Sequence, residues 1–142
     1  MTPGRGGASG AAQRLALVAL VVPDYDEAIG FYVGRLGFRL TSDEDQGEGR
    51  RWVTIAPPGD ALGCQILLAR AATPAQTAAI GNQTGGRVFL ILQTNDFARD
   101  HAAMLAAGVR FEEAPRQEPY GTVAVWQDPF GNRWDLIQFA AR

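Results

Sequence analysis

Apolar positions in the first half of the chain follow the pattern of a strand, then a helix, then three strands. The apolar run at residues 15–22 ends at Pro23 and predicts a buried strand. Asp24 is placed to cap a helix with Glu27 as its capping partner, and apolar residues then recur at helical spacing as far as Leu36. Gly37 ends this helix. Further strands are expected at 38–43, 51–56 and 63–69, separated by turns at 43–49 and 57–60.

The second half repeats this pattern. A strand at 88–94, a helix at 96–107 and strands at 109–113, 122–127 and 133–139 follow in the same order. Asp96-Phe97 stands 72 positions after Asp24-Tyr25, an offset too long for a solenoid unit of about 20–50 residues. The pattern therefore predicts an α+β fold of two βαβββ modules, at about 15–70 and 87–140. A linker at 71–86, with a short helix at 73–80, joins them into one domain spanning 15–142.

The composition and charge of the chain argue against several classes of function. The chain has 142 residues, a net charge of −2 and a pI near 5.3, which argues against a nucleic-acid partner. The longest apolar run is much too short to span a membrane. Residues 1–14 are rich in Gly and Ala, lack the apolar segment of a secretory signal and are expected to form a disordered tail. We therefore expect a cytoplasmic protein without a membrane or nucleic-acid partner.

Several reactive residue types are scarce. All 13 basic residues are Arg, His101 is the only histidine and Cys64 is the only cysteine. Schiff-base chemistry, an intrachain disulfide and a cysteine-based zinc cluster are therefore excluded. Helical spacing places His101 on the same face as Phe97, which favours packing, and strand alternation predicts that Cys64 is buried. Any chemistry must rest on carboxylates, tyrosines, arginines or a metal held by oxygen.

Three segments carry a resemblance to a known family. Residues 22–32, Leu36-Gly37-Phe38 and residues 128–137 resemble the vicinal oxygen chelate superfamily, which includes glyoxalase I, extradiol dioxygenases and bleomycin-resistance proteins. The resemblance covers about residues 15–139. It implies that the two modules form a half-barrel cup and that the protein is commonly a homodimer.

The resemblance also implies where a ligand would bind. The metal enzymes of this superfamily place one metal ligand on the first and last strand of each module. Those positions correspond to Leu17, Gln65, either Val88 or Phe89, and Asp135. The apolar side chains have no donor atoms, and one carboxylate with one amide is too few for a divalent ion. We therefore expect no catalytic metal and no cofactor.

The residues expected to contact a small-molecule ligand are Gln65 and Asp135, with Arg87, Trp52, Tyr120 and Trp126 as further candidates. Strand alternation puts Asp135, Ile137 and Phe139 on one face. Each candidate also has a structural alternative: Asp135 could pair with an arginine, Arg87 could be a solvated strand end, and the aromatic residues could belong to the core.

Three functions remain open at this stage. The first is small-molecule binding of the bleomycin-resistance type without a catalytic metal. The second is a lyase or isomerase that uses Asp135 as a base, or a weak metal site. The third is a non-catalytic interaction module whose cup is filled by its own side chains. The sequence alone leaves open whether the protein is an enzyme, because one fold can carry many functions.

Overall fold

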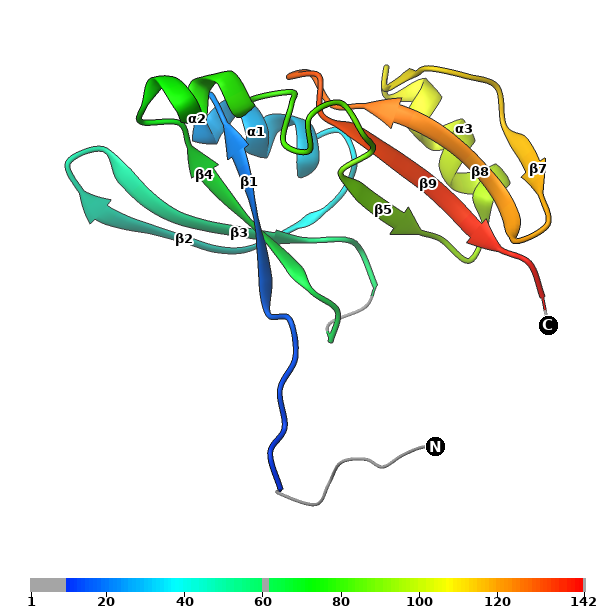
Figure 1. Ribbon diagram of the computed structural model, residues 1–142, viewed down its shortest axis with the longest axis horizontal. Helices are drawn as coiled ribbons and strands as arrows, with labels where there is room; N and C mark the ends of the chain where they lie inside the picture. Colours follow the sequence, from blue (N-terminus) through cyan, green and yellow to red (C-terminus); the bar gives the residue numbers. More distant parts are fainter. Residues whose placement is uncertain (1–9, 60–61, 142) are drawn as a thin grey trace.

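The computed structural model describes residues 10–59 and 62–141, which form two mixed sheets backed by helices (Figure 1). The expected tail at 1–14 falls largely outside the described residues; residues 10–14 are exposed and have no regular structure. No helix in the described part of the chain is long and apolar enough to cross a membrane.

The first sheet contains four strands in the order β1-β4-β3-β2. Its elements are β1 (Leu17–Val22), α1 (Tyr25–Tyr32), β2 (Arg39–Gly47), β3 (Arg50–Ala56) and β4 (Gln65–Arg70). β1 and β4 are parallel, whereas β2 and β3 form an antiparallel hairpin. The short helix α2 (Pro74–Ala79) follows in the linker and is capped by Thr73, whose side chain accepts a hydrogen bond from the backbone of Gln76.

The second sheet repeats this order as β5-β9-β8-β6, with an added strand β7 beside β8. Its elements are β5 (Leu90–Gln93), α3 (Phe97–Ala106), β6 (Arg110–Phe111), β7 (Arg116–Glu118), β8 (Gly121–Gln127) and β9 (Arg133–Phe139). The equivalent of β2 is thus divided into β6 and β7. The predicted α+β class with two βαβββ modules is confirmed.

Both long helices begin as their sequences predict. The Asp24 carboxylate accepts a hydrogen bond from the backbone N–H of Glu27 at 2.8 Å, and Asp96 accepts one from Arg99 at 3.1 Å. These bonds satisfy N–H groups that a helix leaves without partners in its first turn. In Figure 1, α1 lies behind the first sheet and α3 behind the second, so the faces without helices are turned to the viewer.

Three predicted features differ from the structure. The segment 43–49 is not a loop, since β2 continues to Gly47 and only a tight turn remains before β3. The strand predicted at 109–113 is reduced to two residues, and β7 was not predicted. Cys64 is exposed and not buried, because β4 begins one residue later and strand alternation does not yet apply to it.

The core lies between the sheets and the helices and joins the two modules. Phe31 and Tyr32 of α1 contact Trp126 and Trp134 of the second sheet, with ring centroids 6.3 and 5.8 Å apart. Trp126 and Trp134 stack on each other at 4.9 Å. The first helix therefore packs against both sheets, and burial of these large rings supplies much of the apolar contact between the modules.

Candidate functional site

Each sheet has one face without a helix, which we call its cup face. On the first sheet the cup face carries Leu17, Ala19 and Val21 of β1, Gln65, Leu67 and Ala69 of β4, and Trp52, Thr54 and Ala56 of β3; strand register and alternation place them there. On the second sheet it carries Ile91 and Gln93 of β5, Val123 and Val125 of β8, and Arg133, Asp135, Ile137 and Phe139 of β9.

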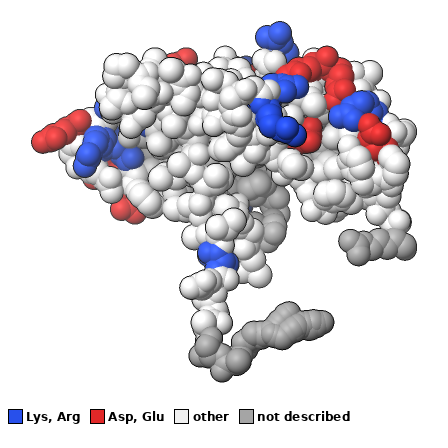
Figure 2. All heavy atoms as spheres, in the orientation of Figure 1, with Lys and Arg blue, Asp and Glu red and all other residues white. Residues whose placement is uncertain are grey.

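The two cup faces differ in charge. In Figure 2, acidic and basic side chains gather over β8 and β9, whereas the surface over β1 and the adjoining part of β4 is almost free of charge. The first cup face is mainly aliphatic, with Gln65 as its central polar group. The second presents charged groups beside aliphatic ones, and that arrangement suits a ligand that is largely apolar with a few polar atoms.

Asp135 lies in a hollow of about 470 Å³ on the second cup face. Arg87, Ile91, Arg116 and Arg133 line the same hollow, together with Gly86, Val88 and Val125. The structure thus brings together Asp135 and Arg87, two of the residues singled out from the sequence. No donor among the described residues hydrogen-bonds to the Asp135 carboxylate.

Burial raises the pKa of Asp135 above its usual value, and the nearby Glu113 carboxylate adds to this rise. The positive charges of Arg116 and Arg133 act in the opposite direction. A half-buried carboxylate with a raised pKa and no hydrogen-bond partner is poised to accept a proton or a ligand hydrogen bond. No arginine in the described part of the chain forms a salt bridge with Asp135, in contrast to the structural alternative.

The neighbouring arginines are largely neutralised. Arg133 donates two hydrogen bonds to the Glu112 carboxylate, at 2.8 and 2.9 Å, and Arg116 pairs with Glu113 at 2.8 Å and with Glu118. Arg87 differs from them, because its exposed guanidinium has no hydrogen-bond partner among the described residues. It is the cation in this hollow that is available to a ligand.

The strand register corrects one of the four positions implied for a metal. Leu17 pairs with Gln65, and in the second module Ile91 pairs with Asp135. The equivalent position is therefore Ile91, and neither Val88 nor Phe89, because β5 begins only at Leu90. Ile91 again has no donor atom. In the described part of the chain, no three His, Cys, Asp or Glu side chains come together as a metal site would require.

The three aromatic candidates occupy different environments. Trp52 lies on the first cup face and is 37% exposed, and Tyr120 is exposed in the turn between β7 and β8. Trp126 is fully buried on the opposite face of β8, so it belongs to the core and does not line the cup. His101 packs between Phe97 and Phe111, as its helical spacing predicts.

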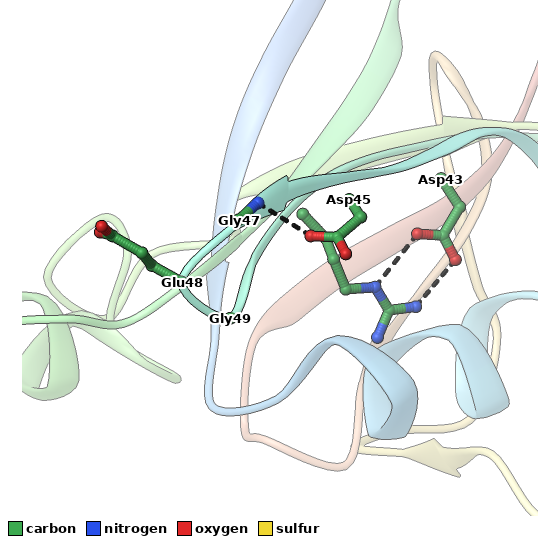
Figure 3. A pocket seen from close by; sticks show the side chains of 6 residues that line it. Asp43, Asp45, Gly47, Glu48 and Gly49 are labelled. Carbon is green, nitrogen blue, oxygen red and sulfur yellow. Dashed lines mark hydrogen bonds and ion pairs between the residues drawn. The ribbon is translucent and has the colours of Figure 1, made fainter.

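A second concave region lies beside the β2–β3 hairpin, where Arg51 donates to both oxygens of Asp43 (Figure 3). Arg51 also pairs with Asp26 at 2.9 Å. The hydrogen bonds from Arg51 hold the pKa of Asp43 below its usual value. Because these charges satisfy one another, the geometry here anchors the hairpin to α1 and leaves few polar groups for a ligand.

Two hydroxyl groups on the first cup face, those of Thr41 and Thr54, were not predicted from the sequence. Thr41 forms a β-bulge in β2, where the register shifts between Leu40 and Ser42. Its hydroxyl lies 2.6 Å from that of Thr54 and 2.7 Å from Oε1 of Gln65. Sequence alternation cannot place a bulged residue, because the extra residue changes which side chains face the cup.

Comparison with known proteins gives the same fold. The model of the Glyoxalase/Bleomycin resistance protein/Dioxygenase superfamily matches residues 14–136. An uncharacterized protein from Shewanella frigidimarina (strain NCIMB 400) is 53% identical over 127 residues, covering 89% of this chain and 93% of its own.

Two solved structures are similar over most of their length. UcmS2 is 28% identical with a TM-score of 0.77, covering 89% of this chain and 98% of its own. TnmS3, an antibiotic binding protein from Streptomyces sp. CB03234, is 30% identical with a TM-score of 0.73, covering 92% and 98%. Since the family model spans most of the sequence and the sheet order repeats between the modules, the chain belongs to the Glyoxalase/Bleomycin resistance protein/Dioxygenase superfamily.

Proposed function

We propose that this protein binds a small organic molecule on its cup faces without a catalytic metal. The observation that carries the proposal is the half-buried Asp135 carboxylate, which has no hydrogen-bond partner among the described residues and lies in the same hollow as Arg87 and Ile91. An acceptor, a cation and an aliphatic side chain in one concavity fit an amphipathic ligand. Similarity to TnmS3, an antibiotic binding protein, supports the same assignment.

The side chains at the four metal-ligand positions support a protein that binds no catalytic metal. Two of the four positions that carry metal ligands elsewhere in the superfamily are Leu17 and Ile91, and the remaining Gln65 and Asp135 offer only oxygen donors. Elemental analysis of the purified protein is expected to find less than stoichiometric transition metal. Chelation should leave the unfolding curve unchanged, whereas a bound metal whose removal lowers stability would contradict this part of the proposal.

We also propose that the protein is a homodimer whose second subunit helps to cover the cup faces. Trp52, Ile91 and Phe139 are 37%, 63% and 51% exposed on these faces in the single chain, which leaves large apolar groups in water. Light scattering over a range of concentrations is expected to give twice the mass of the chain. A monomer at the highest concentrations would contradict it.

The binding proposal is tested by thermal shift with a panel of aromatic and aliphatic metabolites that carry acidic, basic or neutral groups. A ligand of the cup should raise the melting temperature of the wild type, and Asp135→Asn should reduce its affinity by roughly tenfold. Glu48→Gln is the matched control, because it makes the same carboxylate-to-amide change at the tip of the β2–β3 hairpin. Equal losses in both variants, or no shift with any compound, would contradict a ligand role for Asp135.

The raised pKa of Asp135 favours a second candidate, a lyase or isomerase in which this carboxylate abstracts a proton. Turnover of a ligand found in the panel, followed by mass spectrometry, distinguishes the two. An enzyme should lose turnover in Asp135→Asn by a larger factor than it loses affinity. A ligand that is recovered unchanged favours sequestration.

A further inference from the structure

Three side chains on the first cup face form a chain of hydrogen bonds that ends at Gln65. Thr54 lies on β3 and is 5% exposed. Its hydroxyl oxygen is 2.6 Å from that of Thr41, and the Thr41 hydroxyl is 2.7 Å from Oε1 of Gln65. The three residues come from β2, β3 and β4, so the chain crosses the sheet.

The burial of Thr54 determines the direction of these bonds. Its hydroxyl proton has one acceptor among the described residues, the oxygen of Thr41, and a buried hydroxyl proton without an acceptor would be costly. Thr54 therefore donates to Thr41. The Gln65 atom that lies 2.7 Å from Thr41 is the amide oxygen, which can only accept, so Thr41 donates its single proton to it.

This direction also settles which end of the Gln65 amide faces the cup. Its oxygen accepts the proton of Thr41, and its nitrogen is therefore turned away from Thr41. The two N–H groups have no acceptor among the described residues. Strand register places Leu17 beside Gln65, and alternation places Leu67 next to it on the same face of β4; neither side chain offers an acceptor. Gln65 thus presents donors over an aliphatic surface.

We propose that Thr41 and Thr54 are positioning residues that make Gln65 a hydrogen-bond donor, so that the ligand of the cup carries an acceptor oxygen, such as a carbonyl, at this point. The inference rests on the proposed ligand-binding function and adds the polarity of one contact. A free glutamine can offer either its oxygen or its nitrogen to a ligand. Here the two threonines select the nitrogen, and a ligand group that only donates, such as an ammonium, is disfavoured.

The test uses two rigid ligands of nearly equal shape, 9-fluorenone and fluorene, which differ by a carbonyl in place of a methylene. Titration followed by tryptophan fluorescence or calorimetry gives the ratio of their dissociation constants. The wild type is expected to bind fluorenone about tenfold more tightly, the factor of one net hydrogen bond. Gln65→Met, which keeps the side-chain length, should bring the ratio close to one.

Thr41→Val tests the positioning role directly. The valine keeps the shape of threonine but releases the Gln65 amide, so the preference for fluorenone should fall while the affinity for fluorene is retained. Thr122→Val is the matched control, since the Thr122 hydroxyl donates to the Gln117 side chain at 3.0 Å in the other module. Side-chain ¹⁵N relaxation of the ligand-free protein should show a rigid Gln65 amide in wild type and Thr122→Val, and a mobile one in Thr41→Val.

The outcomes separate the two proposals. If the wild type binds both compounds equally, or if its Gln65 amide is mobile, the positioning role of the threonines is wrong while ligand binding stands. If Thr122→Val loses the preference as fully as Thr41→Val, the positioning role is again overturned. If the wild type binds neither compound, the binding function fails for this apolar carbonyl class and the inference about Gln65 falls with it.

Discussion

The hydroxyl of Tyr32 donates a 2.6 Å hydrogen bond to Oδ2 of Asp128, although 96 residues separate the two. The same hydroxyl accepts a hydrogen bond from the indole N–H of Trp134 at 3.1 Å. Asp128 also accepts from the backbone N–H of Phe130 and from both nitrogens of Asn132. A buried carboxylate with four donors is fully satisfied, and it joins α1 to the turn between β8 and β9.

Removing the Tyr32 hydroxyl should destabilise the protein. Burial, together with the Asp128 carboxylate, raises the pKa of Tyr32 well above its usual value, so the side chain remains a donor at all ordinary pH values. Tyr32→Phe loses a bond to a charged acceptor and leaves the Trp134 N–H unpaired. We expect a loss of about 2–4 kcal/mol in the free energy of unfolding by urea. Tyr120→Phe, at an exposed tyrosine, should change it by less than about 0.5 kcal/mol; equal effects would contradict a special role for the buried hydroxyl.

Ionisation of the Asp135 carboxyl should lower the free energy of unfolding as pH rises. Burial raises its pKa in the folded state above the unfolded value of about 3.9, so the folded state holds the proton more tightly. The stabilising protonated form is therefore lost as pH rises through the folded pKa. We expect Asp135→Asn to be more stable than wild type at pH 7, and the difference to shrink as pH falls towards about 4. Urea unfolding across this range measures it, and a difference that is constant with pH would exclude the titration of Asp135 as its cause.

Gln83 should protect the edge of β1 from solvent exchange. Its side-chain oxygen accepts from the backbone N–H of Val21 at 3.3 Å, and its nitrogen donates to the Val21 carbonyl at 2.8 Å and to Asn132 at 3.2 Å. The amide thus replaces a neighbouring strand at a sheet edge. In Gln83→Ala, hydrogen exchange at the Val21 amide should be faster by roughly tenfold. Gln117→Ala is the control, and unchanged exchange at Val21 would show that the linker does not protect β1.

A side chain at position 121 should disrupt the second sheet. Gly121 has a φ of +150°, and a Cβ atom there would lie 2.2 Å from the Gln138 carbonyl oxygen of β9. We expect Gly121→Ala to cost at least about 3 kcal/mol of unfolding free energy or to prevent folding. Gly86→Ala, where φ is +106° and no atom lies within 4 Å of the added carbon, should cost only about 1–2 kcal/mol, through backbone strain. Similar costs at both positions would show that strain, and not the clash, determines the effect.

The sequence predicted the parts of the site that depend on local regularity. β9 spans Arg133–Phe139 as expected, so alternation alone placed Asp135 on the cup face and Trp134 in the core. The sequence predicts Trp126 as a ligand contact, but aromatic residues suit both pockets and cores, so residue type alone does not place it. The pairing of Trp126 with Trp134 across β8 and β9 placed it in the core.

Residues whose roles depend on distant partners could not be found in this way. Asp128 begins the turn between β8 and β9 and accepts there from Phe130 and Asn132, but its bond to Tyr32 exists only because α1 packs on the second sheet. The link between Thr41 and Gln65 needs a bulge and two strand pairings at once. Hydrogen bonds across the sheet depend on register, which the pattern of single residues does not encode.

The sequence by itself determined the duplicated βαβββ plan, the helix caps at Asp24 and Asp96, and the face of the last strand on which Asp135 lies. These follow from spacing and residue type, which act over a few residues. The tertiary structure decided that Ile91 is the partner of Asp135, that Arg87 shares its hollow, and that the Thr41 hydroxyl donates to the Gln65 side chain. Each of these depends on which strands become neighbours, because side chains far apart in the sequence meet only after the sheets have formed.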